Sequence, residues 1–239
     1  MIPLRDNIVS RRFPVVTVAL IVINALVFFH ELSLGSRRLS DYLMVHGVVP
    51  VLFTDPGLCN AVLDAAGWRA VVQPVFTSMF LHGGWAHVIG NMWVLWIFGN
   101  NVEDRLGRLR YLLFYIASGL VAALLHIATN WNSELPTIGA SGAIAGVMGA
   151  YFVLFPHARV QTLVILGFLM DIVTLPAVIF LGLWFLLQLF SGTLGLFSGT
   201  GAGGIAWWAH IGGFAFGALL IKLLVRRPTR RFWNWELVR

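Results

Sequence analysis

Six apolar stretches, most of them long enough to cross a lipid bilayer, limit this chain to folds that place helices in a membrane. They run from Pro14 to Leu34, Trp85 to Asn101, Leu109 to Thr129, Ser141 to Phe155, Pro176 to Leu194 and Gly204 to Val225. A spanning helix needs roughly 20 mostly apolar residues. Because 59% of the 239 residues are hydrophobic and 11% are charged, little of the chain is left for a separate soluble domain. The pattern predicts an all-α, polytopic membrane protein with a bundle of six transmembrane helices.

Basic residues gather on one side of the predicted membrane. Of the 16 lysines and arginines, only Arg37, Arg38 and Arg69 fall on one side of the six spans, and the rest fall on the other side. Because cytoplasmic loops retain Lys and Arg, both termini are expected to be cytoplasmic. Membrane orientation thus explains the net charge of +6, and nucleic acid binding is not expected. The chain divides into a cytoplasmic N-terminal segment (1–13), a membrane domain (14–225) and a basic, aromatic cytoplasmic tail (226–239).

The connections between the spans differ in length. Residues 35–84 are predicted to form a long extracytoplasmic connection, with an Asp-Pro-Gly turn signal at 55–57. The run from Val160 to Met170 is too short to span a bilayer, so we assign it to a cytoplasmic-side turn or to an extension of the fifth helix. The charged turn from Val102 to Gly107 is interpreted as a structural contact that holds cytoplasmic loops in place. Cys59 is the only cysteine, which excludes an intrachain disulfide.

Four polar side chains stand out inside the apolar stretches. His87 and Asn91 lie four residues apart near the outer end of the second span, and therefore share a helical face. Ser141 begins the fourth span, and His210 lies about two turns inside the sixth. Because even-numbered spans run in the same direction, all four side chains are expected at one depth. Polar groups in lipid are costly unless they are paired or line a cavity, so each is a candidate functional residue.

Small residues would let the fourth and sixth spans approach each other closely. Gly139 and Gly142 belong to a glycine-rich turn around Ser141, which leaves backbone N–H groups free beside the serine. Ala145, Gly146 and Gly149 continue a small-residue face along the fourth span, and Gly213 and Gly217 extend a stripe from His210 along the sixth. Packing of the two faces would bring the His210 imidazole to Ser141.

A serine beside a histidine supports acyl-transfer chemistry. The histidine can take the hydroxyl proton, so Ser141 is the candidate nucleophile and His210 the candidate base. The side chains of His87 and Asn91, together with the Ser141 backbone N–H, could stabilise an oxyanion. No third carboxylate is identified to orient the histidine, because Asp171, Glu103 and Asp104 fall on the cytoplasmic side and Glu134 lies in the short outer loop. Either residue alone would more often serve as a helix-packing hydrogen bonder, so the hypothesis rests on their combination.

Three motifs in this order resemble those of the rhomboid family of intramembrane proteases. They are FLHGGWAHVIGN at residues 80–91, GASG at residues 139–142 and AHIGG at residues 209–213. The resemblance implies that Ser141 is the nucleophile, His210 the base, and His87 and Asn91 the lining of the oxyanion hole. It also implies a six-helix core, cleavage of single-pass membrane proteins near the extracytoplasmic face with small residues at the cut, and no metal or organic cofactor.

Two positions depart from the family pattern. Some members carry a tyrosine four residues after the nucleophile that packs on the catalytic histidine, and this chain has Ala145 there. Another residue must therefore steady His210. The Trp-Arg pair of the family's first loop corresponds to Trp68 and Arg69, which stand farther from His82 than the pattern implies, and their role stays open.

The sequence therefore predicts an intramembrane serine endopeptidase whose partners are membrane-protein substrates and the lipid bilayer. The alternatives are a non-catalytic binder or chaperone of membrane segments, or a proton-coupled transporter, which would show internal repeats that are absent here. A metalloprotease is not expected, because the sequence has no HExxH motif. His82 is interpreted as structural, and His30, His126 and His157 as packing or interfacial residues whose partners the sequence does not identify. Short termini favour a prokaryotic plasma membrane.

Overall fold

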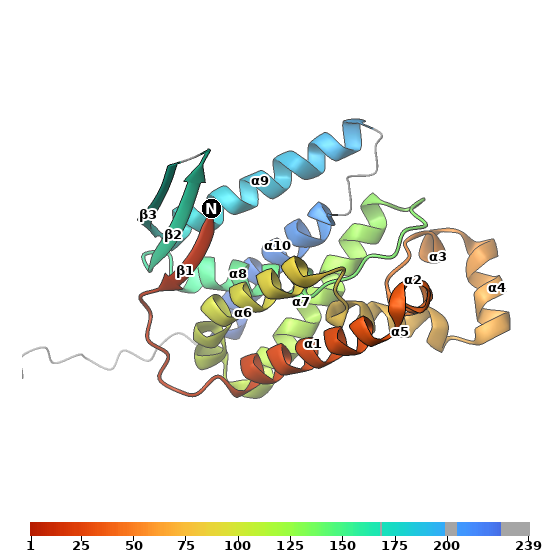
Figure 1. Ribbon diagram of the computed structural model, residues 1–239. Helices are drawn as coiled ribbons and strands as arrows, with labels where there is room; N and C mark the ends of the chain where they lie inside the picture. The colour runs from red at the N-terminus through yellow and green to blue at the C-terminus, as the bar shows by residue number, and fades with distance from the viewer. Residues whose placement is uncertain (168, 199–204, 226–239) are drawn as a thin grey trace, which may run out of the picture.

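Six long helices and a small β-sheet make up the computed structural model, which describes residues 1–167, 169–198 and 205–225 (Figure 1). The long helices are α1 (Val15–Ser33), α6 (Trp85–Leu106), α7 (Arg108–Thr129), α8 (Ser141–Leu154), α9 (Ala177–Ser198) and α10 (Trp207–Leu224). By length and composition, α1, α7, α9 and α10 can cross a membrane, whereas α8 is apolar but shorter. The chain is therefore a mainly helical protein with membrane-spanning helices. The expected tail at 226–239 lies outside the described residues.

Helix α8 lies at the centre of the bundle and packs against α6, α7, α9 and α10. Every residue from Gly142 to Tyr151 is buried. A Cβ atom added to Gly213 or Gly217 of α10 would overlap the carbonyl groups of Gly142 or Gly146 of α8. Glycine at these positions therefore lets the two backbones touch, and this contact sets the distance between the N-terminal turns of α8 and α10.

A three-stranded antiparallel sheet covers one end of the bundle (Figure 1). Its strands are β1 (Ile2–Asp6), β2 (Arg159–Leu166) and β3 (Leu169–Pro176), in the order β1-β2-β3. The expectation of an all-α fold with a simple turn at 160–170 was wrong in this respect. The run from Val160 continues past Asp171 into a hairpin, whose strands pair from Arg159 with Pro176 to Leu166 with Leu169. The N-terminal strand then hydrogen-bonds to β2 across more than 150 residues of sequence.

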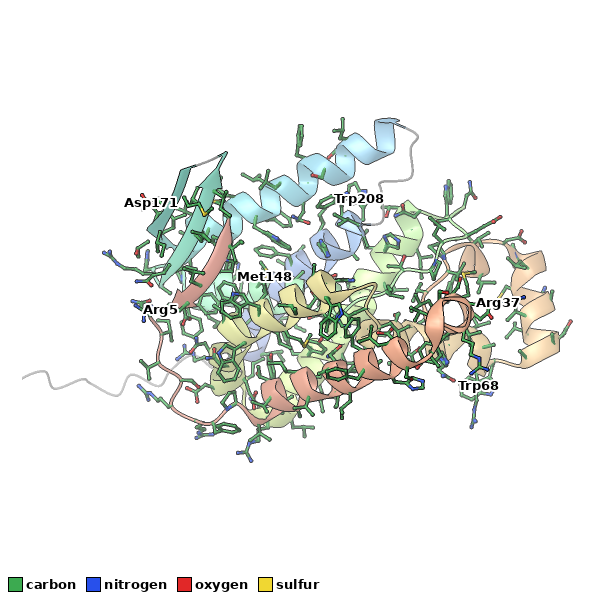
Figure 2. All side chains as sticks on the ribbon, viewed as in Figure 1. Arg5, Arg37, Trp68, Met148, Asp171 and Trp208 are labelled. Carbon is green, nitrogen blue, oxygen red and sulfur yellow. The ribbon has the colours of Figure 1, made fainter. Side chains whose placement is uncertain are left out.

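The long connection between α1 and α6 lies at the opposite end of the bundle (Figure 1). It contains α2 (Gly35–His46), α3 (Val51–Thr54), α4 (Pro56–Ala66), α5 (Arg69–Thr77) and a 3₁₀ turn, η1 (Ser78–Phe80). Asp55 caps α4 by accepting hydrogen bonds from the N–H groups of Gly57 and Leu58 at 2.8 and 3.1 Å. Arg37 and Trp68 mark this end of the molecule, and Arg5 and Asp171 mark the sheet end (Figure 2).

Trp68 is exposed, and the Arg69 guanidinium lies 5.7 Å from its ring centroid. The pair therefore makes a cation–π contact on the surface of the connection, before α5. The residues between this pair and His82 form α5 and η1, which accounts for the separation of the pair from His82 in the sequence.

The carboxylate of Glu103 in α6 joins the charged turn at 102–107 to the start of α1. It accepts hydrogen bonds from the backbone N–H groups of Val16 and Thr17 at 2.9 and 2.8 Å and from the Thr17 hydroxyl at 2.8 Å. Pro14 at the N-cap of α1 has no side-chain acceptor to offer, so Glu103 replaces the missing cap. Glu103 and Thr17 are both buried, so these hydrogen bonds connect α1 and α6 inside the protein.

We predict that Glu103→Ala lowers the free energy of unfolding by about 3 kcal/mol, because two buried donors of Thr17 and one partly buried donor of Val16 lose their acceptor. The measurement is reversible unfolding in detergent micelles, followed by tryptophan fluorescence. Asp104→Ala is the matched control, since Asp104 accepts one longer hydrogen bond, from the Arg11 N–H at 3.2 Å. Equal losses in the two variants would contradict the capping role of Glu103.

Candidate active site

Ser141 is the first residue of α8, and the turn before it requires glycine. Gly139 has a φ of +124°, in the region that disfavours side chains, and an added Cβ would lie 2.7 Å from Nε2 of His87. The Gly139 N–H donates to the carbonyl oxygen of Ser78 at 2.8 Å, which anchors the turn to η1. No side chain caps α8 among the described residues. The backbone N–H groups beside Ser141 are thus available to a ligand.

His210 lies in the first turn of α10, directly beside Ser141. Its Nε2 atom is 2.8 Å from the Ser141 hydroxyl oxygen, within hydrogen-bond distance. Both side chains are half-buried. The sequence predicted His210 about two turns inside a helix starting at Gly204, but α10 begins at Trp207, and Gly204 lies outside the described residues. The contact between α8 and α10 at Gly142 and Gly213, described above, holds the two residues together.

His87 and Asn91 lie one turn apart on α6 and line the same cavity as Ser141 and His210. Nδ1 of His87 accepts a hydrogen bond from the Gly83 N–H at 3.3 Å, so in the neutral ring the proton is on Nε2. That atom lies beside Gly139, next to Ser141. Nδ2 of Asn91 is buried, and no partner for it exists in the part of the chain that the structure describes. Nε2 of His87 and the unpartnered amide nitrogen of Asn91 are therefore the candidate side-chain donors at this cavity.

The cavity around these residues has a volume of about 860 Å³ and is bordered by α6, α7, α8, α9 and α10. Its wall is partly apolar, with Phe98 and Met148 among the contributors, and partly polar. Trp208 and Met148 mark its position in the bundle (Figure 2). The cavity can accommodate an extended peptide backbone next to Ser141, with apolar side chains against its wall.

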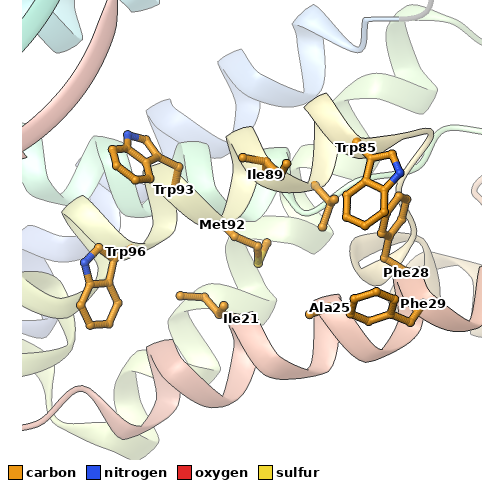
Figure 3. A pocket seen from close by; sticks show the side chains of 10 residues that line it. Ile21, Ala25, Phe28, Phe29, Trp85, Ile89, Met92, Trp93 and Trp96 are labelled. Atoms are coloured by element: carbon orange, nitrogen blue, oxygen red, sulfur yellow. The ribbon is translucent and has the colours of Figure 1, made fainter.

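A second hollow lies between α1 and α6 and differs from this cavity in its chemistry (Figure 3). Its volume is about 440 Å³, and only apolar side chains line it, including Phe29, Trp85 and Trp96. It contains no nucleophile, acid or base. We therefore take the cavity that contains Ser141, and not this groove, as the candidate active site.

Sequence reasoning missed the residues that surround the His210 ring. Oε1 of Gln188 in α9 is 2.8 Å from Nδ1 of His210. The rings of Trp184 and Trp207 flank the imidazole, with centroids 5.9 and 6.4 Å away. These contacts replace the aromatic residue expected at Ala145, which is fully buried in α8. Gln188 is the only amide side chain in the apolar run of α9. Polar residues within a membrane span are candidate functional residues, so this criterion would have identified Gln188 from the sequence.

His82 is buried between α1 and α6, as its structural interpretation implies. Its backbone N–H faces both carboxylate oxygens of Glu31 in α1, each at 3.2 Å, and Glu31 is 1% exposed. The His82 ring meets the His87 ring edge-on, with centroids 5.0 Å apart. Burial, reinforced by the neighbouring His87, lowers the pKa of His82 to about 4, so its ring stays neutral near pH 7. His82 therefore packs behind His87 as an uncharged group.

His126 has hydrogen-bond partners that the sequence alone did not identify. In α7, its Nε2 atom is 2.7 Å from the Thr137 hydroxyl, and its Nδ1 is 3.3 Å from Nδ2 of Asn130. All three residues line the cavity. His30 makes a ring contact with Tyr42 near the C-terminal end of α1. Asn130 follows His126 by one helical turn, whereas Thr137 lies on the connection to α8, and helical spacing does not indicate that second contact.

The matches to curated relatives cover only part of the length of each relative. The chain is 29% identical to presenilin-associated rhomboid-like protein A, mitochondrial, of Danio rerio over 227 residues, which cover 87% of this chain and 54% of that protein. It is 37% identical over 93 residues to RHOMBOID-like protein 6, mitochondrial, of Arabidopsis thaliana, covering 37% of this chain and 30% of the relative. It is 33% identical over 93 residues to Rhomboid protein 1, mitochondrial, of Saccharomyces cerevisiae, covering 36% and 26%.

The chain thus spans about half or less of the length of these relatives. Their names place them in mitochondria, so they give no support to the expectation of a prokaryotic plasma membrane. The family model of the Rhomboid domain matches residues 67–227, which include Ser141, His210, His87 and Asn91 and make up more than half of the chain. The motifs identified in the sequence and this match agree, and the chain belongs to the rhomboid family.

Proposed function

We propose that this protein is an intramembrane serine endopeptidase that cleaves transmembrane segments of membrane proteins with a Ser141–His210 dyad. The 2.8 Å hydrogen bond between the Ser141 hydroxyl and Nε2 of His210 is the observation that carries the proposal. A serine hydroxyl becomes an effective nucleophile only when a base within hydrogen-bond reach takes its proton. Membership of the rhomboid family, which includes intramembrane serine proteases, adds to this support.

In the proposed reaction, Oγ of Ser141 forms a bond to the carbonyl carbon of the substrate while its proton passes to Nε2 of His210. The oxyanion accepts hydrogen bonds from His87, Asn91 and the Ser141 backbone N–H. Collapse of the intermediate breaks the C–N bond, and His210 donates its proton to the leaving amine. His210 then takes a proton from water, which attacks the acyl carbon. When the bond between this carbon and Oγ breaks, His210 returns the proton to Oγ of Ser141, and the carboxylic acid product leaves.

The surroundings of the dyad fit a substrate that comes from the bilayer. The cavity reaches from Ser141 to apolar wall residues such as Phe180 and Trp184, and polar groups including Asn130 line another part of it. A transmembrane segment that unwinds there could place its backbone beside the dyad and leave its apolar side chains against the wall. The proposed substrates are therefore single-pass or other membrane proteins, cut near the extracytoplasmic face.

The proposed topology has six spans with both termini in the cytoplasm. It adds α6 and α8 to the four helices whose length and composition suffice for spanning. Helix α8 has 14 residues, about 21 Å at helical rise, so it can end inside a hydrocarbon core of about 30 Å when other helices surround it. In this topology the sheet is cytoplasmic, and α2 to α5 are extracytoplasmic.

We predict that Ser141→Ala and His210→Ala each lower the cleavage rate of a single-pass substrate at least about 10³-fold, because the dyad acts as a unit. The purified proteins are incubated with the substrate in detergent and in proteoliposomes, and products are identified by mass spectrometry. Ser36→Ala and His157→Ala, which change exposed residues far from the cavity, are the matched controls and should cleave at the parent rate.

The alternative function is a non-catalytic binder of membrane segments. This function would be supported if the parent protein binds the substrate segment without cutting it. The Ser141→Ala variant should then bind the segment with the same affinity. Cleavage that persists in Ser141→Ala after removal of contaminating proteases would also contradict the proposal.

We predict that Asn91→Ala lowers kcat about 100-fold with little change in KM, because the loss of one oxyanion donor acts on the transition state. Asn100→Ala on the same helix is the control, since Asn100 does not line the cavity. The measurement is steady-state cleavage of a fluorogenic transmembrane substrate. Equal kcat values for the two variants would exclude Asn91 from the oxyanion hole.

We predict that an impermeant maleimide added outside intact cells labels Cys59 in α4. In a Cys59→Ser, Val9→Cys variant the label should react only after the membrane is permeabilised, because Val9 lies at the sheet end and is 87% exposed. Labelling of both positions from the same side would contradict the proposed topology.

A further inference from the structure

The imidazole of His210 has a hydrogen-bond contact at each of its two nitrogen atoms. Nε2 faces the Ser141 hydroxyl, and Nδ1 faces Oε1 of Gln188, both at 2.8 Å. A neutral imidazole carries one proton, so one nitrogen donates and the other accepts. Which nitrogen carries the proton decides whether His210 can accept the proton of Ser141.

The orientation of the Gln188 amide is determined by the backbone of its own helix. Its Nε2 group donates to the carbonyl oxygen of Trp184 at 3.3 Å. A carbonyl oxygen only accepts hydrogen bonds, so the NH₂ group must lie on that side, and a flipped amide would place two oxygens against each other. Oε1 of Gln188 is consequently the atom that faces His210. Gln188 is 6% exposed, which protects this arrangement from competing water.

An amide oxygen cannot donate, so Nδ1 of His210 must carry the proton in this contact. Nε2 of the neutral ring then has a free lone pair directed at the Ser141 hydroxyl. This is the tautomer that a general base needs, and in serine proteases with a triad an acidic residue maintains it.

We propose that Gln188 is a positioning residue that holds His210 in the Nδ1–H tautomer and orients its Nε2 atom toward Ser141. This inference rests on the proposed endopeptidase function. When Ser141 transfers its proton to Nε2, the ring becomes a cation, and its Nδ1–H donates to Oε1 more strongly because the hydrogen bond is then charge-assisted. Gln188 touches neither the substrate nor the reacting atoms, and acts through the ring of His210.

The choice of an amide has a physical reason in this environment. A carboxylate at the same position would place a charge in the apolar interior of the bundle, which is costly in a membrane protein. An amide oxygen accepts from Nδ1 without that charge. Trp184, one turn before Gln188 on α9, packs against the same imidazole, so a single face of α9 both orients the ring and covers it.

The first test compares Gln188→Leu, which has a similar size and no acceptor, with Gln188→Glu, which keeps an acceptor oxygen. Gln188→Leu is expected to lower kcat about 10- to 100-fold, the effect of losing one charge-assisted hydrogen bond, with KM within about twofold of the parent. Gln188→Glu is expected to recover kcat to within about fivefold of the parent. Leu187→Ala, an exposed change on the same helix, is the matched control and should keep the parent kcat.

The second test reads the tautomer directly and needs no substrate. ¹⁵N NMR of histidine-labelled protein, at a pH where the ring is neutral, distinguishes a protonated Nδ1 from a protonated Nε2. The parent and Gln188→Glu should show Nδ1–H for His210, assigned with His210→Ala, and Gln188→Leu should shift the population toward Nε2–H. This shift would support the inference in a folded variant even if its activity fell for other reasons.

The two proposals fail in different ways. If the parent cleaves and Gln188→Leu cleaves with the same kcat, or if the tautomer is the same in both, the role of Gln188 is overturned and the dyad stands. If the parent does not cleave any membrane segment, the endopeptidase function fails, while the NMR comparison still decides whether Gln188 sets the tautomer of His210.

Discussion

The backbone contact between α8 and α10 is the interaction on which the candidate site depends. Glycines at 142, 146, 213 and 217 leave no side chain between the two helices. The helices therefore approach closely enough for Ser141 of α8 and His210 of α10 to form a hydrogen bond. In lipid, apolar side chains gain little from burial against one another, so close van der Waals packing of small residues is a main source of helix association. The same contact that stabilises the bundle therefore also sets the distance between Ser141 and His210.

Buried polar groups connect this central contact to the rest of the chain. Glu103 of α6 caps α1, Glu31 of α1 accepts from the backbone of His82, and Gln188 of α9 meets His210 of α10. Each pair joins two segments that are distant in sequence. Because an unpaired polar group in an apolar interior is costly, such pairs specify which helices are neighbours as well as contributing stability. The candidate active site is one member of this set of interhelical polar contacts.

Sequence patterns predicted the family correctly and pointed to one set of candidate site residues, because motif spacing and helical periodicity are local properties. They placed Ser141, His210, His87 and Asn91 in one zone, and the structure has all four around one cavity. They failed for the hairpin of β2 and β3 and its pairing with β1, since strand pairing between Ile2 and Leu163 depends on contacts that local periodicity does not contain. They also did not identify Thr137 as a partner of His126, because Thr137 lies on a loop without regular spacing.

The sequence by itself determined that helices cross a membrane, where small residues allow close packing, and which serine and histidine are chemically suited to each other. Only the tertiary structure decided which side chain orients His210, because Gln188 is 22 residues away on a helix whose rotation the sequence does not specify. It likewise decided that the N-terminal strand joins the sheet and that Glu103 caps α1. The physical reason is the same in each case: hydrogen bonds between elements depend on the relative placement of helices and strands, which packing of the whole chain sets.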